Sequence, residues 1–170
     1  TIPEGVKSLG ASFASDCAFL ETVRLPASLS SIGSDAFSGC SRLGGITLPA
    51  GLIYLSPDAL NGCDSLQAIQ VAAGSATYKA VDGVLYDKSG SVLLRYPAGK
   101  TAASFTLPAG VSAIAEGAFR DSRLQSVALP SGLATMGAGA FAGSQSLTSI
   151  TWPTGGLLKG DKKSYYIDPA

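Results

Sequence analysis

The sequence predicts a β-rich repeat solenoid of about five 23-residue coils with short helical or 3-10 turns and one inserted β-hairpin. Proline recurs every 23 residues at Pro3, Pro26 and Pro49. Apolar residues recur at fixed offsets from each proline, and the same phasing resumes at Pro108 and again from Pro130. Self-similarity at a fixed period of about twenty to fifty residues is typical of a solenoid.

Each coil is expected to contain one half-buried strand just before its proline. Ile46, Thr47 and Leu48, ahead of Pro49, alternate apolar and polar side chains, which is the pattern of a strand with one face in a core. Because proline cannot donate a ladder hydrogen bond, it ends the strand and begins the corner. One coil cannot bury its own apolar face, so we expect the coils to stack and share a continuous core.

A short turn is expected at the middle of each coil. Residues Asp35 to Cys40 suit a single helical turn, with Asp35 as its N-cap and Gly39 at a positive φ that ends it. Asp58 lies one period later, so stacking could bring the two carboxylates to about 5 Å, the separation found in retaining glycosidases. Capping is the favoured interpretation, and a catalytic pair or a weak cation site are the alternatives.

The repeat is interrupted over residues 72–107. Val84–Tyr86 and Val92–Tyr96 are rich in β-formers and flank the turn-forming sequence Asp87-Lys88-Ser89-Gly90, which predicts a hairpin with a four-residue loop.

The predicted domain organisation is a solenoid over residues 1–153, which includes this insertion, and a tail over 154–170. Within the tail, Tyr165–Ile167 could pair with the last coil and cover its open edge. The chain begins at Thr1 inside a repeat, so we expect it to be a processed or trimmed piece of a longer protein.

Three cysteines share one column of the predicted stack. Cys17, Cys40 and Cys63 are 23 residues apart, and Ser122 and Ser144 occupy the same position in later coils. A metal site is disfavoured because the chain has no histidine and no closely spaced cysteine pair. A disulfide between adjacent coils is conceivable on spacing, but parallel side chains rarely reach the required torsion. Small buried thiols that pack a corner are the favoured interpretation.

Composition argues against several classes of function. The chain has 12 Lys plus Arg and 12 Asp plus Glu, so no net field draws it to nucleic acid or to a membrane surface. No apolar run approaches the roughly 20 residues that span a bilayer. Without histidine there is no Ser-His-Asp triad, and no Gly-rich loop leads into a long helix. We therefore predict no enzyme activity, cofactor, metal or transmembrane segment.

The remaining candidates for function are surface residues. Strand residues that point away from the core form a flat face of small polar groups, and several tyrosines are expected near the hairpin. The candidate partner-binding residues are Tyr54, Tyr78, Tyr86 and Tyr96 near the hairpin, and Arg24, Thr47 and Gln70 on the strand face. The alternative for the tyrosines is that they pack the hairpin onto the solenoid.

The recurring segments resemble a known family. Asp35 to Cys40, followed by Leu43 and then Ile46-Thr47-Leu48-Pro49, is similar to the BspA-like leucine-rich repeat, and Asp82 to Tyr86 with Tyr96-Pro97 resembles its hairpin island. The resemblance implies a leucine-rich-repeat right-handed superhelix that is exported by bacteria and held at the cell surface.

The same resemblance implies a function. Family members are usually linked to adhesion, so the expected partner is a protein or glycan of the host or of another bacterium. Anchoring would come through segments outside this chain. A passive spacer that presents another domain at the cell surface is the alternative.

Overall fold

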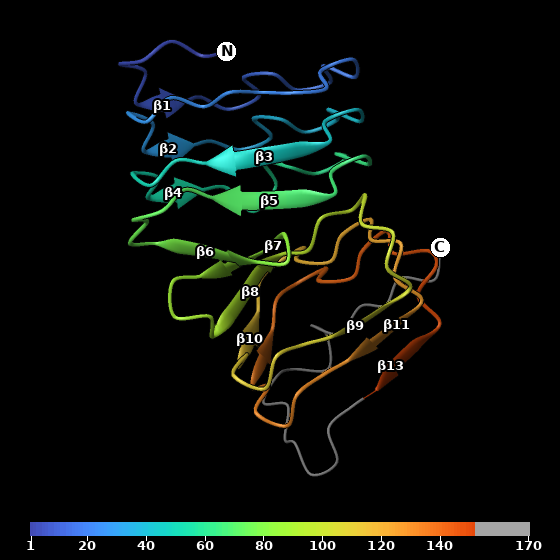
Figure 1. The fold of residues 1–170 in the computed structure, drawn as a ribbon. Coiled ribbons are helices and arrows are strands. Elements are labelled where there is room, and N and C mark those ends of the chain that lie inside the picture. Colours follow the sequence, from blue (N-terminus) through green and yellow to red (C-terminus); the bar gives the residue numbers. More distant parts are fainter. Residues whose placement is uncertain (152–170) are drawn as a thin grey trace.

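The computed structural model describes residues 1–151, which wind into a β-solenoid of about six turns (Figure 1). These residues form short strands and turns and contain no helix. The expected end of the repeat at Pro153, the tail 154–170 and the edge-covering role of Tyr165–Ile167 fall outside the described residues.

The first three coils stack in register, as the proline spacing predicts. One corner of the coils forms a parallel sheet of β1 (Ser8–Leu9), β2 (Ser31–Ile32) and β4 (Tyr54–Leu55), in which Ser8 pairs with Ser31 and Ser31 with Tyr54. The longer strands β3 (Gly45–Leu48) and β5 (Ala68–Val71) also pair in parallel. Each residue therefore lies over its counterpart 23 positions away, which confirms the repeat.

The coils after the insertion repeat this arrangement. The corner strands β10 (Ala113–Ile114) and β12 (Thr135–Met136) pair in parallel. On the other side, β9 (Ser104–Thr106), β11 (Ser126–Ala128) and β13 (Ser149–Thr151) form a parallel sheet. In Figure 1 these three strands run obliquely to β3 and β5, because the insertion separates the two sheets.

The insertion contains the predicted hairpin and a second one. The strands β7 (Val84–Asp87) and β8 (Val92–Arg95) are antiparallel, with boundaries within one residue of those expected. A further strand, β6 (Tyr78–Val81), pairs with β7 through a two-residue turn at Asp82 and Gly83, whose φ angles are +51° and +78°. Asp-Gly is a strong signal for such a turn, and the sequence analysis placed no hairpin there.

The second half of the insertion is itself a coil. The strand β8 pairs in parallel with β10, and β9 with β11, so that Val92 lies beside Ala113 and Ser104 beside Ser126, much as equivalent strands pair in ordinary coils. The backbone N–H of Tyr96 donates to Ala118 O at 2.7 Å, as that of Phe119 donates to Ala140 O in the next coil. The solenoid therefore has about six turns, one more than the five that the repeated apolar positions marked.

The mid-coil turns do not form the single helical turn that was expected. Backbone N–H groups alternate between local acceptors and the next coil, so that Ser38 N donates to Asp35 O whereas Phe37 N donates to Ala59 O. A helix would need every N–H for its own ladder, so coil-to-coil bonding prevents one. Asp35 has a φ of +53°, unlike the extended backbone of an N-cap, whereas Gly39 has the expected positive φ of +74°.

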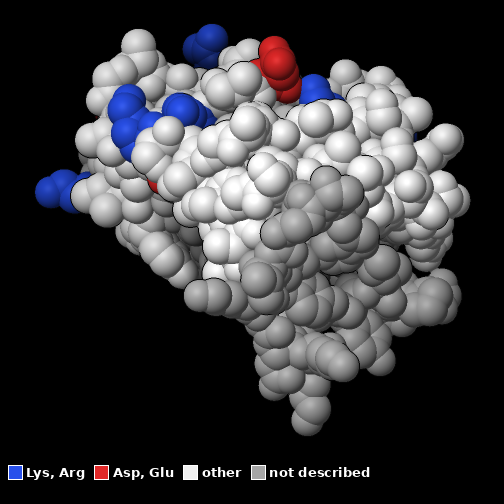
Figure 2. All heavy atoms as spheres, turned by 90° about the horizontal axis from the view of Figure 1, so that it is seen from below, with Lys and Arg blue, Asp and Glu red and all other residues white. Residues whose placement is uncertain are grey.

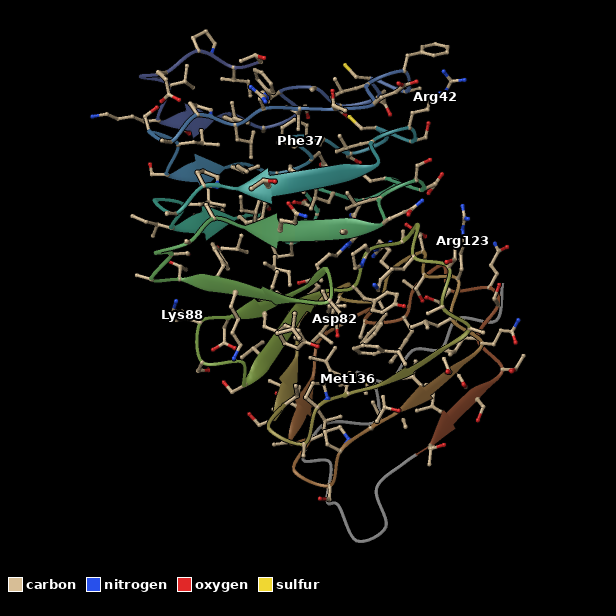
Figure 3. The ribbon with its side chains drawn as sticks, viewed as in Figure 1. Phe37, Arg42, Asp82, Lys88, Arg123 and Met136 are labelled. Atoms are coloured by element: carbon tan, nitrogen blue, oxygen red, sulfur yellow. The ribbon has the colours of Figure 1, made fainter. Side chains whose placement is uncertain are left out.

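Two hydrophobic cores fill the solenoid, and β7 lies between them. The first core contains Phe37 and its neighbours in the early coils (Figure 3) together with Leu85 from β7. The second core contains Val84 and Tyr86 from β7. Both faces of this strand are buried, so the insertion forms a wall that continues the core across the break in the repeat.

Candidate functional site

Three of the candidate residues lie together on the exposed strand face. Arg24, Thr47 and Gln70 are exposed and come from successive coils. Thr47 and Gln70 are paired positions of β3 and β5, and the Thr47 hydroxyl lies 3.3 Å from Gln70 Oε1 and donates to it. The structure therefore places these side chains in one column, as the phasing predicted.

A groove of about 590 Å³ lies beside this column, at the corner where the strands end. Arg24 and Thr47 line it together with Glu4 and the apolar Val23, Leu25, Pro26 and Pro49. We call this the proline-corner groove. The sequence analysis did not foresee it, although its prolines and strand-end apolar residues belong to the repeat itself.

Hydrogen bonds between coils fix the walls of the proline-corner groove. Ile2 N donates to Arg24 O at 3.0 Å, and Ala27 N donates to Glu4 Oε1 at 3.3 Å. Gly5 N also donates to the Ser28 hydroxyl at 2.9 Å. Arg24 lies just before Pro26, and Glu4 lies at the corner of the preceding coil, so the two side chains place opposite charges beside the apolar residues of the groove.

The tyrosines of the insertion are interior residues. Tyr78, Tyr86 and Tyr96 are 9%, 3% and 0% exposed, so they pack the insertion onto the solenoid, which was the alternative interpretation. Burial raises the pKa of Tyr86 to about 12. Their side chains are therefore not on the surface where a contact patch was expected.

The hydroxyl of Tyr78 forms hydrogen bonds with the backbone of the third coil. It accepts a hydrogen bond from Leu55 N at 3.0 Å and donates one to Ile53 O at 3.2 Å. These backbone groups belong to the edge of β4, where the next corner strand would pair in an uninterrupted stack. Tyr78 therefore satisfies this edge in place of a strand.

The fourth tyrosine is on the surface but belongs to a different sheet from the strand face. Tyr54 is 52% exposed and follows Ile53, which is 70% exposed. Both lie at the corner that carries β4, whereas Thr47 and Gln70 lie on β3 and β5 in a different sheet. The seven candidates consequently do not form one patch.

Sequence reasoning also missed Arg95, a buried cation that joins the two halves. Arg95 is 4% exposed. Its Nη2 donates to Leu60 O at 3.0 Å, and its Nη1 donates to Asn61 Oδ1 at 3.0 Å and to Gly117 O at 3.1 Å. Desolvation lowers its pKa. The only sequence signal is an arginine between Leu94 and Tyr96 in an otherwise apolar strand.

Asp58 accepts hydrogen bonds from the turn of the preceding coil. Its carboxylate accepts from the Ser34 hydroxyl at 2.6 Å, the Ser56 hydroxyl at 2.5 Å and Asp35 N at 3.4 Å. The hydrogen bond from Ser34, followed by that from Ser56, lowers the pKa of this carboxyl group. The expected backbone capping is thus present at Asp58, but it acts between coils instead of within one turn.

The cysteine column packs against main-chain carbonyls of the preceding coil. Cys40 Sγ donates to Ala14 O and Cys63 Sγ to Phe37 O, each at 3.2 Å, and Ser144 Oγ makes the equivalent bond in a later coil. Cys40 and Cys63 are buried free thiols, as expected, and burial raises the pKa of Cys63 to about 12. Cys17 is also free but is exposed, because no described coil covers the first one.

The described residues meet neither the requirements of a three-ligand metal site nor those of a membrane-spanning helix. Among residues 1–151, no cluster of three His, Cys, Asp or Glu side chains is placed to hold a metal ion. The same residues include no helix with the length and hydropathy needed to cross a membrane. Seen from below, the described surface is largely uncharged, with a few basic and acidic side chains toward the left and upper margins of the view (Figure 2).

Parallel coils stacked at a 23-residue period, with a polar strand face and an apolar corner groove, define a leucine-rich repeat solenoid. Residues 1–80 and 98–167 match six copies of the BspA type leucine rich repeat region. The chain therefore belongs to the BspA-type leucine-rich repeat family. The family and its structural neighbours suggest a protein-interaction module.

Solved structures of bacterial repeat proteins share this fold. A leucine rich cell surface protein from Faecalibacterium prausnitzii is 36% identical with a TM-score of 0.79, over 89% of this chain and 40% of that one. The pneumococcal vaccine antigen PcpA is 25% identical with a TM-score of 0.68, over 87% and 40%. A leucine-rich repeat protein of T. pallidum is 30% identical with a TM-score of 0.55, over 91% and 64%.

The chain spans only 40% of the length of the first two of these proteins. No curated protein matches the chain.

Proposed function

We propose that the chain is a non-catalytic recognition module of an exported bacterial protein, which binds a host or bacterial macromolecule at the cell surface. The proline-corner groove with its adjoining exposed column, Arg24, Thr47 and Gln70, carries the proposal. It combines an apolar floor with polar groups at its rim, the composition expected of a surface that binds a partner.

The shape of the groove suits an extended segment of a protein partner. It crosses the first three coils, and strands paired at about 4.8 Å place these coils across roughly 10 Å. An extended chain rises about 3.3 Å per residue, so the groove accommodates about three or four residues. Arg24 and Glu4 offer opposite charges, which favours a segment that carries both polar and apolar side chains.

Two findings support a role at the cell surface. The chain belongs to the BspA-type repeat family, and one structural neighbour is described as a leucine rich cell surface protein. A repeat solenoid presents an extended surface, which is suited to the recognition of a macromolecule.

A binding screen against arrayed host matrix proteins, bacterial surface proteins and glycans tests the proposal. The test variant Arg24→Ala/Thr47→Ala removes two side chains of the groove. The matched control Arg42→Ala/Thr106→Ala removes the same two residue types elsewhere. Arg42 lies at the end of the coils where β3 begins (Figure 3), whereas the groove lies where β3 ends.

We expect saturable binding that the groove variant weakens at least about tenfold, as loss of central contacts does, while the control binds as the original protein does. Circular dichroism melts would show that both variants remain folded. Equal binding by both variants would refute the groove as the binding site. Silence across the whole array would instead favour a passive spacer.

A further inference from the structure

A second hollow opens where the insertion interrupts the stack. It has a volume of about 90 Å³ and lies between the third coil and the meander of β6, β7 and β8. We call it the junction pocket. Its floor includes Leu60, Tyr78, Leu85 and Arg95, and its mouth includes Leu55 and Leu94.

The repeat explains why the pocket exists. Phe37, Phe119 and Phe141 occupy the same repeat position, but the third coil has Leu60 there. Tyr96 fills the corresponding place in the coil formed by the insertion, and its ring stacks 5.5 Å from that of Phe119. The smaller side chain at Leu60 leaves space beside the meander, at the position that an aromatic ring occupies in the second coil and in the coils after the third.

The pocket can be reached from solvent. Leu60, Leu85 and Arg95 on its floor are 2%, 1% and 4% exposed, whereas Leu55 and Leu94 are only partly buried. Leu55, Leu60, Leu85 and Leu94 give the pocket apolar walls, against which water gains few hydrogen bonds. An apolar group that lies against these walls therefore meets little competition from water.

Arg95 gives the pocket its charge. All three acceptors of its guanidinium are neutral, namely two backbone carbonyls and the Asn61 amide. Its Nε is buried without a hydrogen-bond partner. Within residues 1–151 no carboxylate oxygen lies within 4.0 Å of Arg95. A buried cation is costly unless an opposite charge accompanies it, so this site is complementary to an anion.

We propose that the junction pocket binds a small organic carboxylate that carries one negative charge on a short alkyl body. The alkyl group would lie against Leu60, Leu85 and Leu94, and the carboxylate would accept hydrogen bonds from the Arg95 N–H groups left free. Guanidinium is well suited to carboxylate because its N–H donors match the two oxygens. This site is separate from the proline-corner groove, and neither proposal depends on the other.

The surroundings restrict the charge and size of the ligand. Asp58 and Glu116 line the adjoining polar hollow with Arg120, and Asp121 exerts a favourable electrostatic influence on Arg95 from beyond ion-pair distance. These carboxylates would repel a second negative charge on the ligand. The volume of about 90 Å³ limits its body to a few carbon atoms.

Isobutyrate is the probe, added to the isotope-labelled protein and followed by NMR at millimolar concentrations. Isobutyramide has the same shape without the charge. We expect saturable shifts of the Arg95 Nε–H signal and of the Leu60 and Leu85 methyl signals with isobutyrate, and an affinity for isobutyramide at least about tenfold weaker.

Two variants make the test independent of the stability of Arg95 substitutions. Ala115→Leu enlarges a residue that lines the pocket, and Ala134→Leu adds the same carbon atoms at an exposed position outside it. We expect the first to abolish the shifts and the second to preserve them. The proposal is overturned if isobutyrate causes no saturable shift, if isobutyramide binds equally well, or if Ala115→Leu binds as the original protein does.

Discussion

The stacked core predicts a gradient of stability along one column of leucines. Leu43 is 0% exposed and lies in a continuous column between Leu20 and Leu66, whereas Leu20 belongs to the outermost described coil and is only partly buried. We expect Leu43→Ala to be substantially more destabilising than Leu20→Ala, because only the first leaves a cavity enclosed by coils on both sides.

The magnitude follows from the atoms removed. Leu43→Ala deletes three carbon atoms, each worth about 0.8 kcal/mol of transfer free energy, or roughly 2.4 kcal/mol together. Every ~40 Å³ of cavity that neighbours do not refill adds about 1 kcal/mol. We therefore expect a loss of about 3–4 kcal/mol in the free energy of unfolding at Leu43. At the partly solvated Leu20 the transfer term is smaller and the cavity opens to water, so the loss should be about 1 kcal/mol.

Equilibrium urea denaturation, followed by circular dichroism, measures both values. The m-value serves as the internal control, because a changed midpoint with an unchanged m-value reports stability alone. Equal losses for the two variants, or no loss for Leu43→Ala, would refute the phasing of the core. Leu66→Ala, at a position that is 1% exposed, should match Leu43→Ala.

Three further predictions concern polar groups and thiols. Asp58→Asn should lower stability by about 1.5–3 kcal/mol at pH 7, the range for hydrogen bonds to a charged group. Since the pKa of Asp58 is lowered in the fold, its contribution is present above the ordinary carboxyl pKa of about 3.9. The contribution disappears as the pH falls through the folded value, so melts of the two proteins should converge in acid; a constant difference would contradict this. Tyr78→Phe should cost about 1–3 kcal/mol because it leaves Leu55 N without its acceptor, and an unchanged denaturation midpoint would exclude that role. In native protein a thiol reagent should modify Cys17 but neither of the two buried cysteines until denaturant is added; rapid modification of all three would show that the corner is open.

The insertion packs against both halves of the solenoid and joins them. Repeat proteins are stabilised by contacts between neighbouring coils, and here β7 supplies contacts to both cores through opposite faces. Leu85 faces the first core and Tyr86 the second. Arg95 adds hydrogen bonds to Leu60 in the third coil and to Gly117 in the coil that begins at Pro108. The break in the sequence repeat is therefore not a break in the packed structure.

Much of the candidate site followed from periodicity alone. The pairing of Thr47 with Gln70 and the burial of Cys40 and Cys63 require only that each coil lies over the last. The burial of Tyr78 and Tyr86 could not be predicted in this way. They lie outside the repeat, so no second copy shows which of their faces meets the core.

The sequence by itself determined the coil length, the parallel register and the positions that face the core. It could do so because a strict repeat places every residue over its counterpart, and alternation along a strand assigns the faces. Only the tertiary structure decided that the insertion supplies a sixth turn, that Arg95 bonds to Leu60 and Gly117, and that a pocket remains beside Leu60. Those features depend on how the meander of β6, β7 and β8, which has no second copy in the sequence, packs against both cores.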